Sequence, residues 1–375
     1  CRMGEMNPRY PAVIINHRNY RENARQIISL CADHGIRVAG VIKGINGVDG
    51  IAEDMAAAGA AMIASSRMEQ LRRAKAANTG LPILLIRVPM LSEIPELIQV
   101  ADISLNSEIA TLEALNREAL RQGRTHRVIL MADLGDLREG WWFDHDELVD
   151  AAERVEKEMP GLYLEGIGTN LGCYGSIMPT EDKMLYLAEL AERVEKRIGR
   201  ELDVVSGGAT SSLMALYDGY MPPKINMLRI GAAILAGSLE DLRTVYGYDQ
   251  LEELSCETAV LQAQIIELKK KATYPVGKRG VDAFGQRPDY VDRGERMRAL
   301  IAVGRADYGD ITDILPVMEG VEVIGASGDH TIVDVENAAE PLQVGDILTF
   351  RLRYSGILRL TDSENVRLYH IPADA

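Results

Sequence analysis

The chain has 375 residues, of which 47% are hydrophobic and 26% charged, and its 41 basic and 56 acidic side chains give a formal charge of −15. This composition excludes a largely disordered chain, and the length suffices for two or three domains or for one large barrel with a smaller partner. The acidic balance argues against nucleic acid as a partner, because neutralising phosphates requires clustered Lys and Arg.

Between residues 36 and 237, short apolar runs alternate with longer amphipathic stretches. The apolar runs predict eight strands, at Arg37–Ile42, Ala61–Ala64, Ile83–Val88, Ala101–Leu105, Arg127–Ala132, Leu164–Gly168, Asp203–Ser206 and Ile225–Ile230. The stretches between them predict helices, among them Ser66–Ala77, Asn106–Gln122, His145–Glu158, Thr180–Ile198 and Ser211–Gly219. Strands that alternate with helices indicate a parallel sheet, and eight such units favour a closed (β/α)8 barrel.

After Leu239 the pattern changes to β-rich runs with no long amphipathic helix between them. Strands are predicted within residues 257–268, 297–303, 321–326, 331–335 and 346–353, which indicates a C-terminal antiparallel β domain. Pro11–Ile15 has no βα partner of its own, and we expect it to join that domain. The predicted domains are the barrel over residues 16–238 and the β domain over residues 239–375 with residues 10–15. The basic run Lys269–Lys271 is interpreted as a solvated turn.

Two features of the sequence bear on where the protein works. The longest apolar patches, such as Leu81–Leu91, are short and broken by Pro and Arg, and the first nine residues lack an apolar core. Neither a membrane span nor a secretory signal is therefore expected. The cysteines form no Cys-x-x-Cys pair, and a chain of this size does not need disulfides, so we expect a reducing, cytoplasmic setting. They are Cys1, Cys31, Cys173 and Cys256.

Lys43 ends the first predicted strand, in the sequence Val41-Ile42-Lys43. The active site of a (β/α)8 barrel lies at the C-terminal ends of its strands, so the ammonium is expected to point into the barrel mouth. Desolvation and neighbouring cations lower the pKa of a lysine in such a place, which prepares the amine for a Schiff base. The alternative is a lysine whose stem lies along apolar surface while its ammonium reaches water.

Two Gly-containing turns follow the seventh and eighth predicted strands. They are Ser206-Gly207-Gly208-Ala209-Thr210-Ser211-Ser212 and Arg229-Ile230-Gly231-Ala232-Ala233. Backbone N–H groups at a helix N-terminus bind phosphate, and the loops after strands seven and eight are the usual phosphate site of such barrels. The first turn alone could be an ordinary helix cap, but the two turns together favour a phosphate site.

The sequence gives little support for a metal centre. Of the six histidines, only His330 lies near acidic residues, Asp329 and Asp334, and this spacing is more typical of a turn and a strand face. The chain also contains neither a Gly-x-Ser-x-Gly motif nor a P-loop. We therefore expect no metal.

Taken together, these features resemble the fold-type III pyridoxal-phosphate enzymes, the alanine racemase-like barrels. The resemblance is closer to the ornithine racemase branch and extends from Tyr10 to about Arg359. It implies pyridoxal 5'-phosphate as the cofactor. The motifs that carry it are Val41-Ile42-Lys43, Arg87-Val88-Pro89-Met90-Leu91, Ala101-Asp102-Ile103-Ser104-Leu105-Asn106-Ser107-Glu108, Asp133-Leu134-Gly135-Asp136-Leu137-Arg138-Glu139-Gly140, Asn170-Leu171-Gly172-Cys173-Tyr174-Gly175, Val205-Ser206-Gly207-Gly208, Gly280-Val281-Asp282-Ala283-Phe284-Gly285 and Gly325-Ala326-Ser327-Gly328-Asp329-His330.

The resemblance also implies roles for individual residues. Lys43 holds the cofactor as a Schiff base, and Arg138 lies near the phenolic oxygen and the substrate carboxylate. Arg229 faces the pyridine nitrogen, and because arginine keeps its proton, this nitrogen stays unprotonated and transamination is suppressed. The further cofactor contacts that it implies are Asn170, Ser206, Gly207, Gly208, Thr210, Gly231, Ala232 and Tyr354. The further substrate contacts are Asp282, Gly328 and Asp329.

Three positions depart from the alanine racemase pattern. Phe284 stands where that family has a catalytic tyrosine contributed across the dimer, Gly47 where a tyrosine binds the phosphate, and Met131 where a carbamylated lysine lies. The second acid–base group is therefore not given by the resemblance.

Cys173, Asp282 and Tyr290 are the candidates for that group. Asp282 and Phe284 are two residues apart and would share one face of a strand, so Asp282 could reach the partner's site. Asp282 could instead bind the distal ammonium of ornithine. Cys173, after the sixth predicted strand, is either an acid–base group or a buried structural thiol.

The resemblance thus implies a homodimeric amino-acid racemase for a basic amino acid such as ornithine or lysine, or for alanine. The alternative is a lyase of the D-threonine aldolase or D-serine dehydratase type, whose metal site near the C-terminus Asp329-His330 with Asp334 would echo. A small cofactor-carrying homeostasis protein of the same barrel is a third possibility, but such proteins lack the β domain.

Overall fold

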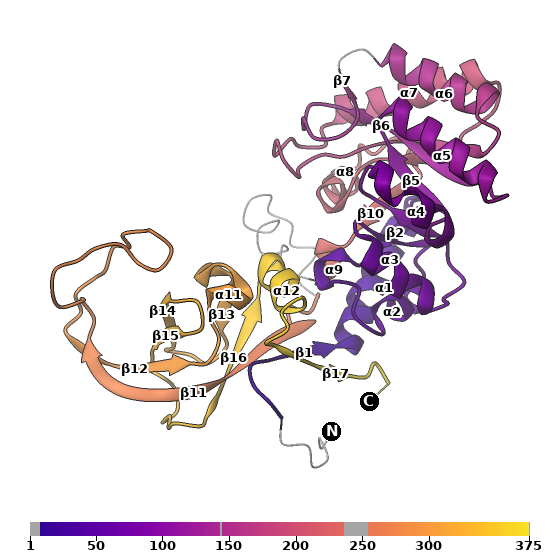
Figure 1. Cartoon of the computed structure of the whole chain (residues 1–375). Coiled ribbons are helices and arrows are strands. Elements are labelled where there is room, and N and C mark those ends of the chain that lie inside the picture. The colour runs from indigo at the N-terminus through magenta and orange to yellow at the C-terminus, as the bar shows by residue number, and fades with distance from the viewer. Residues whose placement is uncertain (1–7, 143–144, 236–253, 375) are drawn as a thin grey trace. The chain divides into compact units, whose positions relative to one another are not determined.

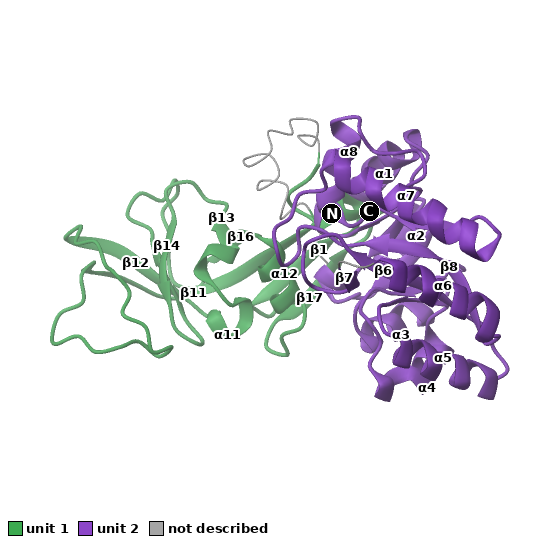
Figure 2. Ribbon diagram, turned by 90° about the horizontal axis from the view of Figure 1, so that it is seen from above, with its two compact units in different colours: residues 1–20, 235–375 green, residues 21–234 purple. Residues whose placement is uncertain are grey.

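The computed structural model describes residues 8–142, 145–235 and 254–374. The chain forms two compact units, shown in separate colours in Figure 2. The barrel unit comprises residues 21–234, and the β unit comprises residues 1–20 and 235–375. The domain boundary expected after residue 238 falls within residues 236–253, which lie outside the described residues.

Among the described residues, eight parallel strands close into a barrel in the barrel unit (Figure 1). Hydrogen-bonded neighbours follow the order β2–β3–β4–β5–β6–β8–β9–β10, and β10 pairs with β2 to close the ring. All eight overlap the predicted apolar runs, which confirms the (β/α)8 prediction. The strands are β2 (Arg37–Val41), β3 (Met62–Ser65), β4 (Ile83–Leu85), β5 (Ile103–Asn106), β6 (His126–Asp133), β8 (Leu162–Thr169), β9 (Val204–Ser206) and β10 (Met227–Ile230), and the two-residue strand β7 (Trp141–Trp142) pairs alongside β6.

Helices precede and connect the barrel strands. They are α1 (His17–Asp33), α2 (Ile51–Ala57), α3 (Met68–Ala76), α4 (Ile94–Val100), α5 (Ile109–Arg121), α6 (Asp146–Glu158), α7 (Glu181–Ile198), α8 (Leu213–Tyr217) and α9 (Ala232–Leu235). Helices α2 and α4 are not among the predicted ones, because seven residues make only two turns and show no clear helical period. None of the helices in the described part of the chain is long and apolar enough to cross a membrane.

The barrel interior is filled by apolar side chains. Strands β3 and β5 are buried along their whole length. Helices and the barrel core cover the two faces of each strand, so apolar residues occupy neighbouring positions along a strand instead of alternating strictly with polar ones. The buried interior residues are Ala39, Val41, Met62, Ala64, Leu84, Ile103, Leu105, Ile129, Met131, Val204 and Met227. This packing gathers the polar residues that follow the strands around one mouth.

The β unit is built around one long strand. Strand β11 (Ala259–Ala272) pairs antiparallel with β12 (Glu295–Ile301), β16 (Ile347–Leu352) and β1 (Ala12–Asn16). The unit also contains β13 (Ile314–Pro316), β14 (Glu322–Ala326), β15 (Thr331–Asp334), β17 (Arg367–Ile371) and the helices α11 (Arg305–Tyr308) and α12 (Tyr354–Leu360). The prediction of an antiparallel β domain is confirmed.

The basic run Lys269–Lys271 belongs to strand β11, so its interpretation as a turn is wrong. These lysines are exposed and pair in register with Arg298, Met297 and Arg296 of β12. The strand runs this far because it pairs with β12 as far as Ala272. A solvated edge of a sheet tolerates lysine as readily as a turn does.

Candidate active site

Lys43 lies at the C-terminal end of the barrel, two residues beyond the end of β2. It is the first residue of the short 3-10 helix η1 (Lys43–Ile45) rather than the last residue of a strand. Its side chain is half-buried, and burial lowers the pKa of its ammonium. The guanidiniums of Arg138 and Arg229 lower this pKa further. The acidic groups of Cys173 and Glu139 raise it. A lysine with a lowered pKa is more often in its neutral, nucleophilic form.

Arg229 is buried within β10, with 4% of its surface exposed. Its Nη1 donates to Ser206 Oγ on β9, and its Nη2 donates to the carbonyl oxygen of Thr169 on β8 at 2.8 Å. Burial lowers the pKa of Arg229 to about 10, so the guanidinium keeps its charge at neutral pH. Two neighbouring strands therefore hold a permanent cation inside the barrel mouth.

The two Gly-containing turns after β9 and β10 lie side by side. The backbone N–H of Arg229 donates to Gly208 O at 2.9 Å, and that of Ala233 donates to Thr210 Oγ1 at 3.4 Å. Gly208 has a φ of 121°, and a Cβ at Gly231 would lie 2.5 Å from Val41 O. Both positions therefore require glycine, and the turns allow the close backbone approach that phosphate binding uses. The structure brings together Ser206, Gly207, Gly208, Thr210, Gly231 and Ala232.

Arg138 and Glu139 lie on the loop after β6 and form an ion pair through two hydrogen bonds. Arg138 Nε donates to Glu139 Oε2, and Arg138 Nη2 donates to Glu139 Oε1 at 2.5 Å. The Glu139 side chain is only 13% exposed, and this carboxylate raises the pKa of Arg138 above its ordinary value. Arg138 also interacts with the thiol of Cys173. Arg138, which the resemblance places near the substrate carboxylate, is thus already paired with a carboxylate of the protein itself.

The loop after β8 carries Asn170 and Cys173. Cys173 Sγ donates to Asn170 Oδ1 at 3.6 Å. The buried carboxylate of Asp136 accepts four successive backbone N–H groups of this loop, at distances between 3.0 and 3.3 Å, from Gly172, Cys173, Tyr174 and Gly175. Cys173 is exposed, so its interpretation as a buried structural thiol is wrong.

Two buried amide atoms near the ends of barrel strands have no hydrogen-bond partner within the described ranges. They are Asn170 Nδ2 after β8 and Asn106 Oδ1 at the end of β5. An unsatisfied buried polar group costs about 1–3 kcal/mol and marks a place where a ligand or an ordered water completes a site. An amine with a lowered pKa, a buried guanidinium, narrow backbone turns and unpaired amide atoms together fit the cofactor that the resemblance implies.

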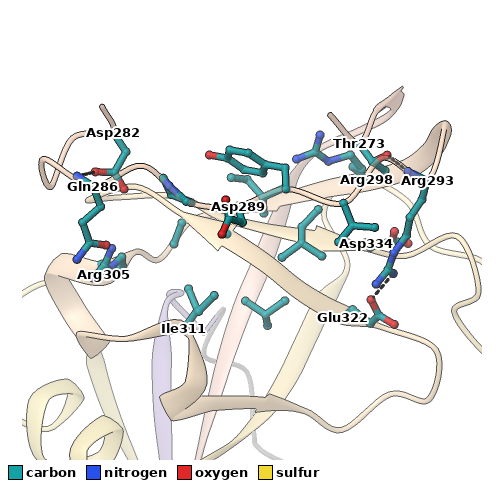
Figure 3. Close-up of a pocket in the computed structure, with 18 of the residues that line it drawn as sticks. Thr273, Asp282, Gln286, Asp289, Arg293, Arg298, Arg305, Ile311, Glu322 and Asp334 are labelled. Atoms are coloured by element: carbon teal, nitrogen blue, oxygen red, sulfur yellow. Dashed lines mark hydrogen bonds and ion pairs between the residues drawn. The ribbon is translucent and has the colours of Figure 1, made fainter. Parts of the chain in front are cut away.

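Among the predicted residues of the β unit, Asp282 lines a cavity of about 480 Å³ within that unit (Figure 3). Asp282 Oδ1 accepts the backbone N–H groups of Phe284 at 2.9 Å and of Gln286 at 2.8 Å. Residues 282–286 therefore form a turn, and the expectation that Asp282 and Phe284 share one face of a strand is wrong. Tyr290 lines the same cavity.

Helix α11 links this turn to the other predicted substrate residues. The Arg305 guanidinium lies 4.1 Å from the centre of the Phe284 ring, and Ala306 N donates to Gly328 O at 3.0 Å. Gly328 and Asp329 occupy the turn between β14 and β15. Helix α11 thus contacts the turn that carries Asp282, through Phe284, and the turn that carries Gly328 and Asp329, whereas Tyr354 lies at the start of α12.

Asp334, the acidic residue of the possible lyase-type metal site, is engaged in an ion pair. Arg296 of β12 donates to its carboxylate from Nε at 2.5 Å and from Nη2 at 3.2 Å. Within the part of the chain that the structure describes, no three His, Cys, Asp or Glu side chains are grouped as a metal site would require.

Sequence reasoning missed two residues of this site, Asp136 and Glu139. Both lie inside the quoted segment Asp133–Gly140. Two glycines with φ values of 116° and 128°, Gly135 and Gly140, enclose them and could have marked a tightly folded loop. Asp136 binds residues far along the chain, which no local pattern encodes, whereas Glu139 binds the adjacent Arg138 in a pair of residues that has no distinctive sequence.

Comparison with known proteins adds a family to this geometry. Residues 15–238 match the family described as alanine racemase, N-terminal domain. The ornithine racemase of Acetoanaerobium sticklandii is 38% identical over 357 residues, which is 95% of this chain and 98% of that protein. The lysine racemase of Thermotoga maritima is 38% identical over 364 residues, which is 97% of this chain and 99% of that protein.

Solved structures share the fold at lower identity. The alanine racemase of D-cycloserine-producing Streptomyces lavendulae superimposes with a TM-score of 0.75 at 20% identity, covering 98% of both chains. A D-threonine aldolase from Filomicrobium marinum superimposes with a TM-score of 0.70 at 15% identity, covering 94% of this chain and 88% of that one. At such identities these likenesses establish the fold alone.

Proposed function

Because the chain belongs to the alanine racemase family, we propose that it is a pyridoxal 5'-phosphate-dependent racemase that interconverts the L and D forms of an amino acid. The observation that carries the proposal is the environment of Lys43. Its half-buried amine has a lowered pKa and lies within the influence of two arginines, Arg138 and Arg229. A lowered pKa increases the neutral fraction of the amine, which is the form that attacks a carbonyl carbon.

The residues that would hold the cofactor come from several barrel strands. Lys43 Nζ would be the covalent attachment point, the turns at Gly208 and Gly231 would receive the phosphate, and Arg229 would face the ring nitrogen. When bound, this cofactor withdraws electrons from the bonds of the substrate Cα and makes its hydrogen acidic. Tyr354, in the β unit, remains a predicted further contact.

Racemisation requires a proton acceptor on one face of Cα and a proton donor on the other. Lys43 Nζ serves one face, because its lowered pKa makes the neutral, proton-accepting form of the amine more available. Cys173 Sγ serves the other face. In support of this role, its thiol is exposed, its loop is held by Asp136, and it interacts with Arg138.

A basic amino acid is the proposed substrate, with ornithine and lysine ahead of alanine. The names of the two relatives that are 38% identical support this choice. In the proposed homodimer, Asp282 of the partner subunit binds the distal ammonium. Its Oδ1 already holds a turn, which leaves Oδ2 as the acceptor. The described cysteines are free thiols, in keeping with a reducing, cytoplasmic setting; they are Cys31, Cys173 and Cys256.

Borohydride reduction of the holoenzyme, followed by peptide mapping, tests the attachment point. A pyridoxyl group is expected on the peptide that contains Lys43. Lys183 and Lys224 are internal controls, because one donates to Leu134 O at 2.7 Å and the other pairs with Glu195 at 2.6 Å. A label on either control would contradict the assignment.

A chiral separation of amino acids tests the reaction. L-Ornithine, L-lysine and L-alanine are incubated in turn with the holoenzyme, and the D form is expected to accumulate from ornithine and lysine. Asp282→Asn should raise KM for ornithine and lysine while sparing alanine. Formation of glycine from D-threonine without racemisation of any of the three would establish a lyase instead.

A further inference from the structure

The ion pair between Arg138 and Glu139 lies next to the attachment lysine. We propose that Glu139 is a positioning residue, which fixes the guanidinium of Arg138 so that one edge of it remains to bind the α-carboxylate of the substrate. This inference rests on the proposed function, because it assigns a role within the same site.

The hydrogen bonds define which edge of Arg138 is used. A guanidinium carries five N–H donors in a planar fork and can hold two carboxylates on two different edges. Glu139 takes the edge formed by Nε and Nη2, with Oε2 on Nε and Oε1 on Nη2. Glu139 does not engage Nη1, so the edge formed by Nη1 and Nη2 can receive a second planar anion beside the Cys173 thiol, which also interacts with this guanidinium. An α-carboxylate has the matching geometry.

The backbone holds this pair in place. Asp133 Oδ1 accepts the N–H groups of Gly135 at 2.9 Å and of Leu137 at 3.1 Å, which folds the loop before the pair. After the pair, Gly140 has a φ of 128°, and a Cβ there would lie 2.4 Å from Asp133 N. Residues 141 and 142 then pair with the end of β6 as strand β7. Glu139 is therefore anchored on both sides and can restrain a flexible arginine.

The charges around Glu139 give it a second effect. Its carboxylate favours the charged forms of all three cations of the site, Lys43, Arg138 and Arg229. The Cys173 thiol likewise raises the pKa of each of these three cations. Since the Glu139 side chain is only 13% exposed, water screens these interactions less than it would at the surface.

A surface pair of the same geometry offers a matched control. On α5, Arg121 Nε donates to Glu118 Oε2 at 2.7 Å, and Arg121 Nη2 donates to Glu118 Oε1 at 2.6 Å. Glu118 is also 13% exposed, but Arg121 is 68% exposed. This pair lies at the C-terminal end of α5, which is at the opposite end of the barrel from the mouth. Glu118→Gln thus removes an equivalent carboxylate outside the site.

The first experiment compares the holoenzymes of Glu139→Gln, Glu139→Asp and Glu118→Gln. For Glu139→Gln, KM is expected to rise by about tenfold for ornithine, lysine and alanine alike, because all three present the same α-carboxylate to Arg138. The turnover number should change much less. Glu139→Asp keeps the charge and should recover part of the loss, whereas Glu118→Gln should behave as the wild type.

The second experiment needs no turnover. The visible absorbance of the cofactor bound at Lys43 is followed as a function of pH. Loss of the Glu139 charge removes a group that favours the protonated form of the Lys43 nitrogen, so the spectral midpoint of Glu139→Gln is expected at lower pH than that of the wild type. The midpoint of Glu118→Gln should stay unchanged.

The outcomes separate this inference from the proposed function. Unchanged KM values and an unchanged midpoint in Glu139→Gln would overturn the role of Glu139 while leaving racemisation intact. A rise in KM for ornithine and lysine but not for alanine would overturn it too, because Glu139 would then bind the distal ammonium. If the wild type racemises none of the three substrates, the proposed function fails, whereas the spectral midpoint still tests Glu139. If Glu139→Gln does not fold, the KM values of Glu139→Asp decide, because its shorter side chain displaces the carboxylate from Arg138; KM should rise for all three substrates alike, and unchanged values would overturn the role of Glu139.

Discussion

Arg229 Nη2 donates to the carbonyl oxygen of Thr169 at 2.8 Å, which ties the last barrel strand to the end of β8. This bond and the contact with Ser206 hold the guanidinium in one orientation inside the barrel. Because burial lowers the pKa of Arg229 only to about 10, the guanidinium keeps its proton at neutral pH and would give none to the ring nitrogen of the proposed cofactor.

Arg229→Glu is therefore expected to change which reaction occurs. A glutamate can give a proton to the ring nitrogen, which strengthens electron withdrawal and raises transamination relative to racemisation. The measurement is the amount of pyridoxamine phosphate formed per racemised substrate. Arg229→Lys keeps a cation at this position and should keep the ratio low. An unchanged ratio in Arg229→Glu would remove Arg229 from this role.

Cys173→Ala is expected to separate proton exchange from racemisation. Without the thiol, Lys43 can still remove and return the Cα proton on its own face, so one enantiomer should incorporate deuterium from D2O with its configuration retained. Racemisation should fall by about 10²–10⁴, the usual contribution of a general acid or base. Chiral separation with mass spectrometry measures both quantities. Cys256→Ala, an exposed thiol of the β unit, is the control, and full racemisation by Cys173→Ala would turn attention to Tyr290.

Asp136→Asn is expected to loosen the loop that carries Cys173. The carboxylate accepts at least four backbone N–H groups, and an amide offers one acceptor oxygen and brings two unwanted donors. Hydrogen exchange should accelerate at residues 172–175, and the free energy of unfolding should fall by about 1–3 kcal/mol. Asp150→Asn, in an exposed ion pair with Arg197, should show neither effect. Unchanged exchange at residues 172–175 would contradict the assignment.

The buried His126 is expected to make the folded protein less stable in mild acid. Its ring lies buried at the start of β6, with Nε2 2.8 Å from Ser104 Oγ, and burial lowers its pKa to about 4. A histidine in the unfolded chain takes up a proton near pH 6.5, so the folded state loses stability as the pH falls from about 6.5 to about 4. The loss reaches about 3 kcal/mol for this group.

Denaturant unfolding between pH 7 and pH 4 measures this effect. His126→Gln should be less stable than the wild type at pH 7, but its stability should depend less on pH over this range. His34→Gln serves as the control, because His34 is exposed and should leave the pH dependence as it is. Parallel curves for His126→Gln and the wild type would show that another group causes the acid sensitivity.

The barrel could be predicted because its strands are continuous apolar runs separated by amphipathic stretches. Each run coincided with a strand, since burial on both faces leaves a strong local signal. Lys43 and the glycine turns could be placed for the same reason, because strand ends fix the mouth of a parallel barrel. The short helices α2 and α4 carry too few turns for such a signal.

The remainder of the site depends partly on contacts between loops that lie far apart in the sequence and partly on local contacts whose sequences are not distinctive. Asp136 binds backbone N–H groups some forty residues away, and these groups have no sequence signature. Glu139 binds its own neighbour, but nothing in the letters Arg-Glu distinguishes this pair from the many exposed pairs of the surface. Asp282 was expected on a strand, whereas its own carboxylate closes a turn.

The Asp136 contacts also have an evolutionary consequence. The carboxylate binds backbone N–H groups, which every residue except proline provides. Apart from the glycines whose backbone requires them, the side chains of this loop are free to vary without loss of its shape. Single substitutions in this loop can therefore change the side chains beside the site while the conformation of the loop backbone stays the same. Selection for a different substrate amino acid can therefore change the side chains of this loop while its backbone conformation is retained.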